Sequence, residues 1–158
     1  MGWRISVEFK TSNIHGTGVF AKFPIKAGTR LWEYDHTMNV SDRAELRSLS
    51  PERLRFALHG GYLHAPSDKF LWYTDGMQFM NHAETGIANV GLGFWPELSD
   101  DHCVALRDIE PGEELLEDYA FWANGGLSPG HWLHQFYMEF CREHYAFLTS
   151  LEPLKIPA

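Results

Sequence analysis

The chain has 158 residues, of which 44% are hydrophobic, and its 13 basic and 21 acidic side chains give a net charge of −8. This length suits one domain with a substantial core. The negative charge argues against a surface that follows nucleic-acid phosphates and allows attraction to a basic partner. No apolar run approaches the ~20 residues of a spanning helix, and the first residues lack the apolar core of a signal peptide. We therefore expect a cytoplasmic protein with no membrane contact and no direct nucleic-acid binding.

Short strands are predicted in the first part of the chain. Apolar and polar residues alternate over residues 5–9, as in a half-buried strand, and similar segments follow at 19–21 and 29–34. Pro24 and Gly28 mark a turn before the third of these segments.

A small helical insert is predicted at about residues 42–59. Ser41 or Asp42 can cap a first short helix. Ser50, followed by Pro51 at the first helical position, begins a second helix that ends near Gly60.

The second half of the chain changes from strands to helix. Aromatic and β-branched residues alternate with turn residues from 70 to 106, and residues 104–109 form a further predicted strand. A C-terminal helix is predicted with Ser128 as its cap and Pro129 at its first position. Its apolar face consists of Leu133, Phe136, Tyr137, Phe140, His144 and Phe147. No repeat or low-complexity linker suggests a second domain.

Two glycines separated by one residue lie between two strand-like segments. Gly16 and Gly18 let the chain turn sharply and remove side chains that would keep a ligand from the backbone. By itself, a Gly-x-Gly of this kind is most often a hairpin turn. It is not a phosphate loop, because no Gly-Lys-Ser/Thr is present and no helix-forming run follows Gly18.

Two further motifs lie downstream. Asn81-His82 alone would predict a polar turn with a histidine bonded to the backbone. Residues 110–119, with the sequence EPGEELLEDY, end in Tyr119. Together with SNIHGTGVFA at residues 12–21, these motifs resemble, in the same order, the SET-domain lysine methyltransferases.

This resemblance implies a fold and a cofactor. The fold is a mainly β SET fold of short strands with a knot-like C-terminal crossing, a small helical insert and a C-terminal helix. The cofactor is S-adenosylmethionine. We predict a SET domain over residues 1–125 and a C-terminal helical extension over 126–158 that packs on the same domain.

The loop after the second motif departs from the family pattern. In the family, Asn-His is followed by Ser-Cys-x-Pro-Asn. Here Ala83 and Glu84 replace Ser-Cys, the proline is missing, and Asn89 arrives two residues late. The resemblance therefore does not predict the path of the loop after His82.

The resemblance also implies roles for individual residues. Tyr119 is assigned to the methyl-transfer site, where its hydroxyl helps to orient the amine, and Tyr34 is assigned as a second active-site tyrosine. The implied cofactor-binding residues are His15, Gly16, Thr17, Gly18, Asn81, His82 and Trp122. The candidate residues of the acceptor channel are Trp72, Tyr73, Phe79, Glu117 and Phe121. Ordinary core packing is the competing interpretation for the aromatic residues among them.

The chemistry that this site must perform is modest. A lysine ammonium, with a reference pKa near ~10.4, must lose a proton before its nitrogen can attack. Burial in an aromatic channel and a neighbouring sulfonium both disfavour the positive charge and so promote that loss. The remaining requirement is to align nitrogen, methyl and sulfur.

Glu117 lies two residues before Tyr119, at a position that is usually aromatic or aliphatic in the family. In a regular strand, alternation places Glu117 and Tyr119 on the same face. A carboxylate facing the channel would stabilise a charged amine, or select another cationic acceptor. A carboxylate facing solvent would do neither.

A metal enzyme is the rival class. His131 with His134, and Cys141 with His144, are ligand types at short spacing. On one continuous helix, however, His131 and Cys141 lie about 15 Å apart, too far to share one zinc. The cysteine-rich zinc segment of the family is absent, so we expect no metal. The C-terminal helix would then close the cofactor and lysine sites, or pair with another subunit in a homodimer.

We therefore predict an S-adenosylmethionine-dependent protein-lysine N-methyltransferase that acts on a protein or peptide with an exposed lysine. Two alternatives stay open. The chain could be a catalytically idle SET fold that binds a basic peptide, or it could methylate a small amine. The sequence does not identify the acceptor, the degree of methylation or the oligomeric state.

Overall fold

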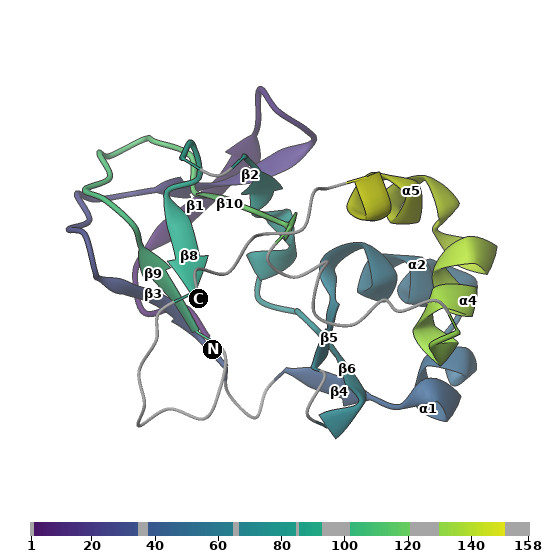
Figure 1. The fold of residues 1–158 in the computed structure, drawn as a ribbon. Helices are drawn as coiled ribbons and strands as arrows, with labels where there is room; N and C mark the ends of the chain where they lie inside the picture. The colour runs from purple at the N-terminus through teal and green to yellow at the C-terminus, as the bar shows by residue number, and fades with distance from the viewer. Residues whose placement is uncertain are drawn as a thin grey trace, which may run out of the picture. The chain divides into compact units, whose positions relative to one another are not determined.

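The computed structural model describes residues 2–34, 38–64, 67–84, 86–92, 102–120 and 130–150 (Figure 1). The chain divides into two compact units. Unit 1 consists of Met1–Met38 and Thr74–Asp118, and unit 2 consists of Asn39–Tyr73 and Tyr119–Ala158. The predicted helical insert and the predicted C-terminal extension therefore fall in the same unit.

The described part of unit 1 contains a hairpin and a five-stranded sheet. β1 (Val7–Thr11) and β2 (Thr17–Ala21) form the antiparallel hairpin. The sheet has the order β3-β9-β8-β10-β7, and Figure 1 shows β8 and β9 side by side within it. Its strands are β3 (Arg30–Glu33), β9 (His102–Ala105), β8 (Val90–Leu92), β10 (Leu116–Glu117) and β7 (Asn81–His82).

The short strand β10 has an unusual position in this sheet. It lies between β7 and β8 and pairs in parallel with both, although β7 and β8 are consecutive strands in the sequence. The end of the last motif is thus inserted between two earlier strands. This insertion brings the second and third sequence motifs into register, with Leu116 opposite Asn81 and Glu117 opposite His82.

Two strand predictions in unit 1 need correction. The first strand runs from Val7 to Thr11 rather than over residues 5–9. The strand predicted at 104–109 ends at Ala105, and Ile109 makes only an isolated bridge. This second strand ends at Ala105 because the segment that faces it turns at Gly28, which has a φ of +79°.

Unit 2 combines a small sheet with helices. The sheet is antiparallel, with the order β4-β6-β5. The elements of unit 2 are β4 (Asn39–Ser41), α1 (Arg43–Ser48), α2 (Pro51–Gly60), β5 (Tyr62–His64), β6 (Lys69–Trp72), α4 (Trp132–Phe140) and α5 (Arg142–Ser150).

The helices of the insert begin at the residues that the capping pattern predicts. Asp42 accepts a hydrogen bond from the Glu45 N–H at 2.9 Å, and the Glu45 carboxylate accepts one from the Asp42 N–H at 2.7 Å. This is a reciprocal capping box. Ser50 caps α2, and Pro51 occupies its first turn, where a missing N–H is tolerated.

The prediction of one continuous C-terminal helix is wrong. α4 ends before Cys141, whose φ of −148° and ψ of 44° are not helical, and α5 begins at Arg142. The two helices run in different directions (Figure 1). His131 caps α4 by accepting from the Leu133 N–H at 3.1 Å. The predicted cap at Ser128 and Pro129 lies outside the described residues.

The helix break is supported by contacts between α4 and α5. The ring of Tyr145 stacks on Tyr137 with 5.8 Å between centroids, and its hydroxyl is hydrogen-bonded to His134. In a continuous helix, residues 134 and 145 would be about 16 Å apart along the axis. The aromatic residues of α5 therefore reach α4 only because the chain turns at Cys141.

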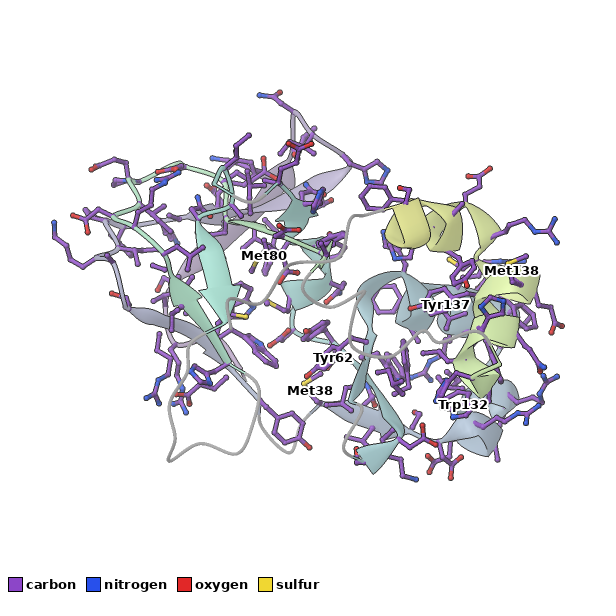
Figure 2. All side chains as sticks on the ribbon, viewed as in Figure 1. Met38, Tyr62, Met80, Trp132, Tyr137 and Met138 are labelled. Carbon is purple, nitrogen blue, oxygen red and sulfur yellow. The ribbon has the colours of Figure 1, made fainter. Side chains whose placement is uncertain are left out.

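The core of unit 2 is apolar and aromatic. It consists of Leu46, Leu54, Ala57, Leu58, Phe70, Trp72, Leu133, Phe136 and Tyr137. On α4, Figure 2 labels Tyr137, which is buried, and Met138, which is exposed. The Tyr137 hydroxyl donates to the Leu58 carbonyl at 2.9 Å, and burial raises the pKa of Tyr137. The single polar group that this ring brings into the core is therefore satisfied.

The helices of the described segments are too short or too polar to cross a membrane.

Candidate functional site

The turn between β1 and β2 presents its backbone to solvent. The Ser12 hydroxyl accepts from the Ile14 N–H at 2.9 Å, and the Ser12 N–H donates to the Gly16 carbonyl at 2.9 Å. Gly16 has a φ of +51°, and nothing lies within 4 Å of the position that a Cβ would take. This conformation favours glycine, and the open space leaves the backbone accessible to a ligand.

Asn81 joins this turn to the sheet. Its side chain, in a residue that is 8% exposed, donates from Nδ2 to the carbonyls of His15 at 3.0 Å and Thr17 at 3.5 Å, and to Oε1 of Glu114 at 2.9 Å. We expected the Asn81 amide to bind the cofactor. In the structure, its N–H groups bind the backbone of the turn, so this amide holds the turn in place.

Gly18 has a different environment from Gly16. A Cβ at Gly18 would lie 2.2 Å from Oε1 of Glu114. The Glu114 carboxylate fills this space, and its Oε2 accepts a hydrogen bond from the Ser12 hydroxyl at 3.0 Å. The missing side chain of Gly18 therefore makes room for a carboxylate of the last motif.

Asn89 fastens the last motif to the loop after His82. It is 1% exposed. Its Nδ2 donates to the Glu114 carbonyl at 2.8 Å and to Oε1 of Glu113 at 3.3 Å, and its Oδ1 accepts from the Leu116 N–H at 2.8 Å. These bonds are the kind that a buried amide requires.

The late position of Asn89 in the sequence is accommodated by a turn. The N–H groups of Ile87 and Ala88 both donate to the Glu84 carbonyl, and Gly86 has a φ of +91°. After this turn, the Asn89 N–H donates to the Leu116 carbonyl at 3.0 Å. The altered loop therefore still delivers an asparagine to the last motif.

His82 lies on β7 beside the end of the last motif. It is opposite Glu117 in the parallel register, and the Ala83 N–H donates to the Glu117 carbonyl at 3.0 Å. Nδ1 of His82 is 3.9 Å from Oδ1 of Asp118. That separation is too long for a hydrogen bond and allows an ion pair only when the imidazole is protonated.

The argument that placed Glu117 and Tyr119 on one face is wrong. β10 ends at Glu117, and Tyr119 lies in a turn. Strand alternation therefore does not extend to Tyr119. Asp118 is the last residue of unit 1, and Tyr119 begins the second segment of unit 2.

Tyr119 contacts the C-terminal helix within unit 2. Its half-buried ring meets Phe147 of α5 edge to face, with 6.2 Å between centroids and 72° between ring planes. This is a favoured geometry for an aromatic pair. Phe147 is itself 40% exposed. The ring that α5 places against the predicted catalytic tyrosine therefore also contacts solvent.

Two of the predicted channel residues lie in the interior of unit 2. Trp72 belongs to the apolar core, and its Nε1 donates to the Ser41 hydroxyl at 3.2 Å. Tyr73 is buried, with its ring 6.0 Å from that of Tyr62. Trp72 is thus packed in the core, as the competing interpretation of these aromatic residues predicts.

The other assigned aromatic residues have varied positions. Phe79 is partly exposed in unit 1, and its ring meets Phe9 edge to face at 6.0 Å. Tyr34 directly follows β3 and is half-buried. Phe121 and Trp122 lie outside the described residues.

The break at Cys141 removes the distance argument against zinc, because that argument assumed one helix. Among the residues that the structure describes, however, no three His, Cys, Asp or Glu side chains converge in a way that could hold a metal ion. His134 is instead bonded to Tyr145, and His131 to Asp68 at 2.7 Å.

Sequence reasoning did not single out Glu114 as a site residue and treated Asn89 only as a displaced motif residue. Glu114, which follows Gly112 and Glu113, had no signal of its role in the sequence. For Asn89 the signal was a polar side chain between Ala88 and Val90. Such a side chain is costly to bury unless it is hydrogen-bonded, so it indicates a specific partner. The partners themselves could not be read from the sequence.

The charge of the chain is divided unequally between the units. Unit 1 carries 14 acidic and 6 basic side chains, whereas unit 2 carries seven of each. The whole net charge of −8 therefore belongs to the unit that contains the first two motifs and the third motif up to Asp118.

Comparison with known proteins connects these motifs to a family. The pattern of the SET domain matches residues 16–120. No curated protein matches the chain.

Solved structures with a similar fold include a candidate histone methyltransferase of Plasmodium falciparum. The two chains are 16% identical with a TM-score of 0.50, over 79% of this chain and 96% of that one. A humanized mutant of the Chaetomium thermophilum Polycomb Repressive Complex 2 is 23% identical with a TM-score of 0.55, and an active polycomb repressive complex 2 in the basal state is 22% identical with the same score. Each of these matches covers 73% of this chain and 15% of the other. The predicted fold class is confirmed.

Proposed function

The chain belongs to the SET-domain family, and we propose that it is an S-adenosylmethionine-dependent methyltransferase that modifies a lysine side chain of a protein substrate. The observation that carries this proposal is the joining of three separate motifs in unit 1. Asn81 and Glu114 hold a turn whose backbone is open at Gly16. An open, well-held backbone turn fits a ligand that is bound through main-chain groups.

The residues of this turn have distinct roles in the proposal. S-adenosylmethionine supplies a methyl group on a sulfonium when it is bound. His15, Gly16 and Thr17 would hold it through their backbone, and Asn81 keeps that backbone in position. His82 is assigned to the same site by the family resemblance.

Tyr119 would orient the acceptor amine through its hydroxyl. Phe147 restricts the Tyr119 ring by packing against its edge. Tyr34 is proposed as the second tyrosine of the transfer site. The chain needs no general base for the transfer itself, because the acceptor loses its proton before attack and the remaining task is alignment.

The charge distribution favours a basic acceptor. A unit with a net charge of −8 attracts a basic segment at long range. This attraction would weaken as salt is added.

The altered loop after His82 gives little support to the first alternative, an idle fold that binds a basic peptide, because Asn89 still fastens the last motif. Methylation of a small amine has no specific observation in its favour.

Cofactor binding and methyl transfer test the proposal in sequence. We expect S-adenosylmethionine or its demethylated product to raise the melting temperature of the protein, because a ligand of the native state stabilises it. Radiolabelled methyl transfer to basic proteins, followed by amino-acid analysis, should then identify methyl-lysine. Binding without transfer would support the idle fold, and no binding at saturating cofactor would contradict the proposal.

A pair of tyrosine variants tests the assignment of the transfer site. Tyr119→Phe should remove most of the transfer while cofactor affinity stays nearly unchanged, because only the hydroxyl is lost. Tyr145→Phe is the matched control, since it removes a tyrosine hydroxyl elsewhere in unit 2. Equal losses of transfer in the two variants would mean that Tyr119 has no special role.

A further inference from the structure

Glu114 occupies the point at which the three motifs meet. Its backbone forms an isolated bridge with Phe20, and the neighbouring Leu115 N–H donates to the Val19 carbonyl at 2.7 Å. Its backbone is therefore fixed against β2. From there the side chain is hydrogen-bonded to Ser12 and Asn81.

The two oxygens of the Glu114 carboxylate have different partners. Oε2 accepts from the Ser12 hydroxyl at 3.0 Å, and Oε1 accepts from Asn81 Nδ2 at 2.9 Å. Both partners also bind the turn directly. Ser12 accepts from the Ile14 N–H, and Asn81 donates to the His15 and Thr17 carbonyls. Both links from the Glu114 carboxylate thus end on the backbone that surrounds Gly16.

The space around the Glu114 carboxylate is also restricted. A Cβ at Gly18 would approach Oε1 to 2.2 Å and Cδ to 2.8 Å, so only glycine at this position leaves the carboxylate where it is. A carboxylate in this position is therefore a firm support for the turn.

We propose that Glu114 is a positioning residue for the cofactor turn: through Ser12 and Asn81 it holds the backbone at residues 14–17 in the conformation that binds the cofactor. This inference rests on the proposed function, because it assumes that the turn receives S-adenosylmethionine. Glu114 is not assigned a contact with the cofactor or with the reacting atoms.

Three variants separate a positioning role from a role of the charge itself. Glu114→Ala removes both acceptors and should weaken cofactor affinity roughly ten- to a hundredfold. Glu114→Gln keeps the shape and one acceptor oxygen, and its amide can donate to the Ser12 oxygen, so it should retain much of the affinity. Glu110→Ala, at an exposed glutamate of the preceding turn, is the control and should bind like the wild type.

The kinetic consequences are equally specific. In Glu114→Ala, KM for the cofactor should rise, while KM for the acceptor and kcat at saturating cofactor stay close to the wild-type values. Gly18→Ala should have the same effect, because it displaces the carboxylate. If Glu114→Gln is as damaging as Glu114→Ala, the charge is what matters and the positioning role is wrong. Unchanged affinity in Glu114→Ala would also overturn the inference.

Hydrogen exchange in the ligand-free protein makes this test independent of catalysis. The Ile14 amide, which donates to Ser12, should exchange faster in Glu114→Ala than in Glu110→Ala, while the amides of β9 remain unchanged. If the wild-type protein binds no cofactor, the proposed function fails. The exchange rates then still decide whether Glu114 holds the turn, and equal rates in the two variants would show that it does not.

Discussion

The two units of this chain are stabilised in different ways. In unit 2, apolar side chains from helices and strands form one contiguous cluster, and the polar groups within it are few. Unit 1 also buries apolar side chains, among them Leu31, Trp32 and Met80. Its short strands and turns are in addition tied together by buried or half-buried polar side chains, chiefly Asn81, Asn89 and Glu114. Apolar contacts tolerate small shifts, whereas hydrogen bonds require particular positions. The unit that carries the motifs is therefore the one whose backbone is positioned most specifically.

The largest expected effect is the loss of a core ring in unit 2. Phe136 is completely buried in α4, so Phe136→Ala should lower the free energy of unfolding by about 3–5 kcal/mol. Phe56→Ala, at a partly exposed phenylalanine of α2, is the matched control and should cost much less. Urea denaturation measures both values. Similar costs in the two variants would contradict the apolar-core description of unit 2.

Removal of one buried amide should have the next largest effect. Asn89→Ala leaves the Leu116 N–H and the Glu114 carbonyl without the side chain that now binds them. An unsatisfied buried group costs about 1–3 kcal/mol. Asn13→Ala, at an exposed asparagine of the hairpin turn, should have little effect on the melting temperature. If Asn89→Ala is equally mild, polar side chains do not hold unit 1 together.

The contact between Phe147 and Tyr119 predicts an effect on rate rather than stability. Phe147→Ala should lower kcat several-fold, because the Tyr119 ring loses the neighbour that restricts it. Stability should change by no more than about 0.5 kcal/mol, since Phe147 is substantially exposed. Met138→Ala, at an exposed position of α4, supplies the comparison. A fall in stability with no change in kcat would show that Phe147 only packs.

The smallest expected effect concerns acid sensitivity in unit 1. The hydrogen bond from Arg30, together with Arg4, lowers the pKa of Glu33 against an opposing effect of burial. A lowered pKa contributes stability that is present above the pKa of the unfolded state and is lost as pH falls through that of the folded state. Glu33→Gln should therefore cost about 0.5–1 kcal/mol at pH 7, and this cost should shrink as the pH falls through the folded-state pKa of Glu33.

Denaturation curves at several pH values measure this difference. Glu8→Gln is the control, because Glu8 makes only an exposed ion pair with Lys10 at 3.3 Å. A Glu33→Gln cost that does not vary with pH would mean that the carboxylate contributes through its shape alone.

Local features of the fold could be predicted because their causes are local. Asp42, Ser50 and Pro51 each act within one turn of the helices that they begin, so sequence order is enough to recognise them. The end of α4 could not be predicted in this way. The apolar spacing continues through Cys141, and the break depends on contacts of Tyr145 with Tyr137 and His134 that form only after the chain has turned.

The candidate site shows the same division. By itself, the sequence determined the family, the order of the motifs and the glycine that leaves the backbone of the turn open. Only the tertiary structure decided that Asn81 binds a carbonyl 66 residues away and a carboxylate 33 residues away, and that Asn89 meets Leu116 across 27 residues. The physical reason is that a buried polar group must find a partner, but which partner it finds depends on how strands distant in the sequence are brought together.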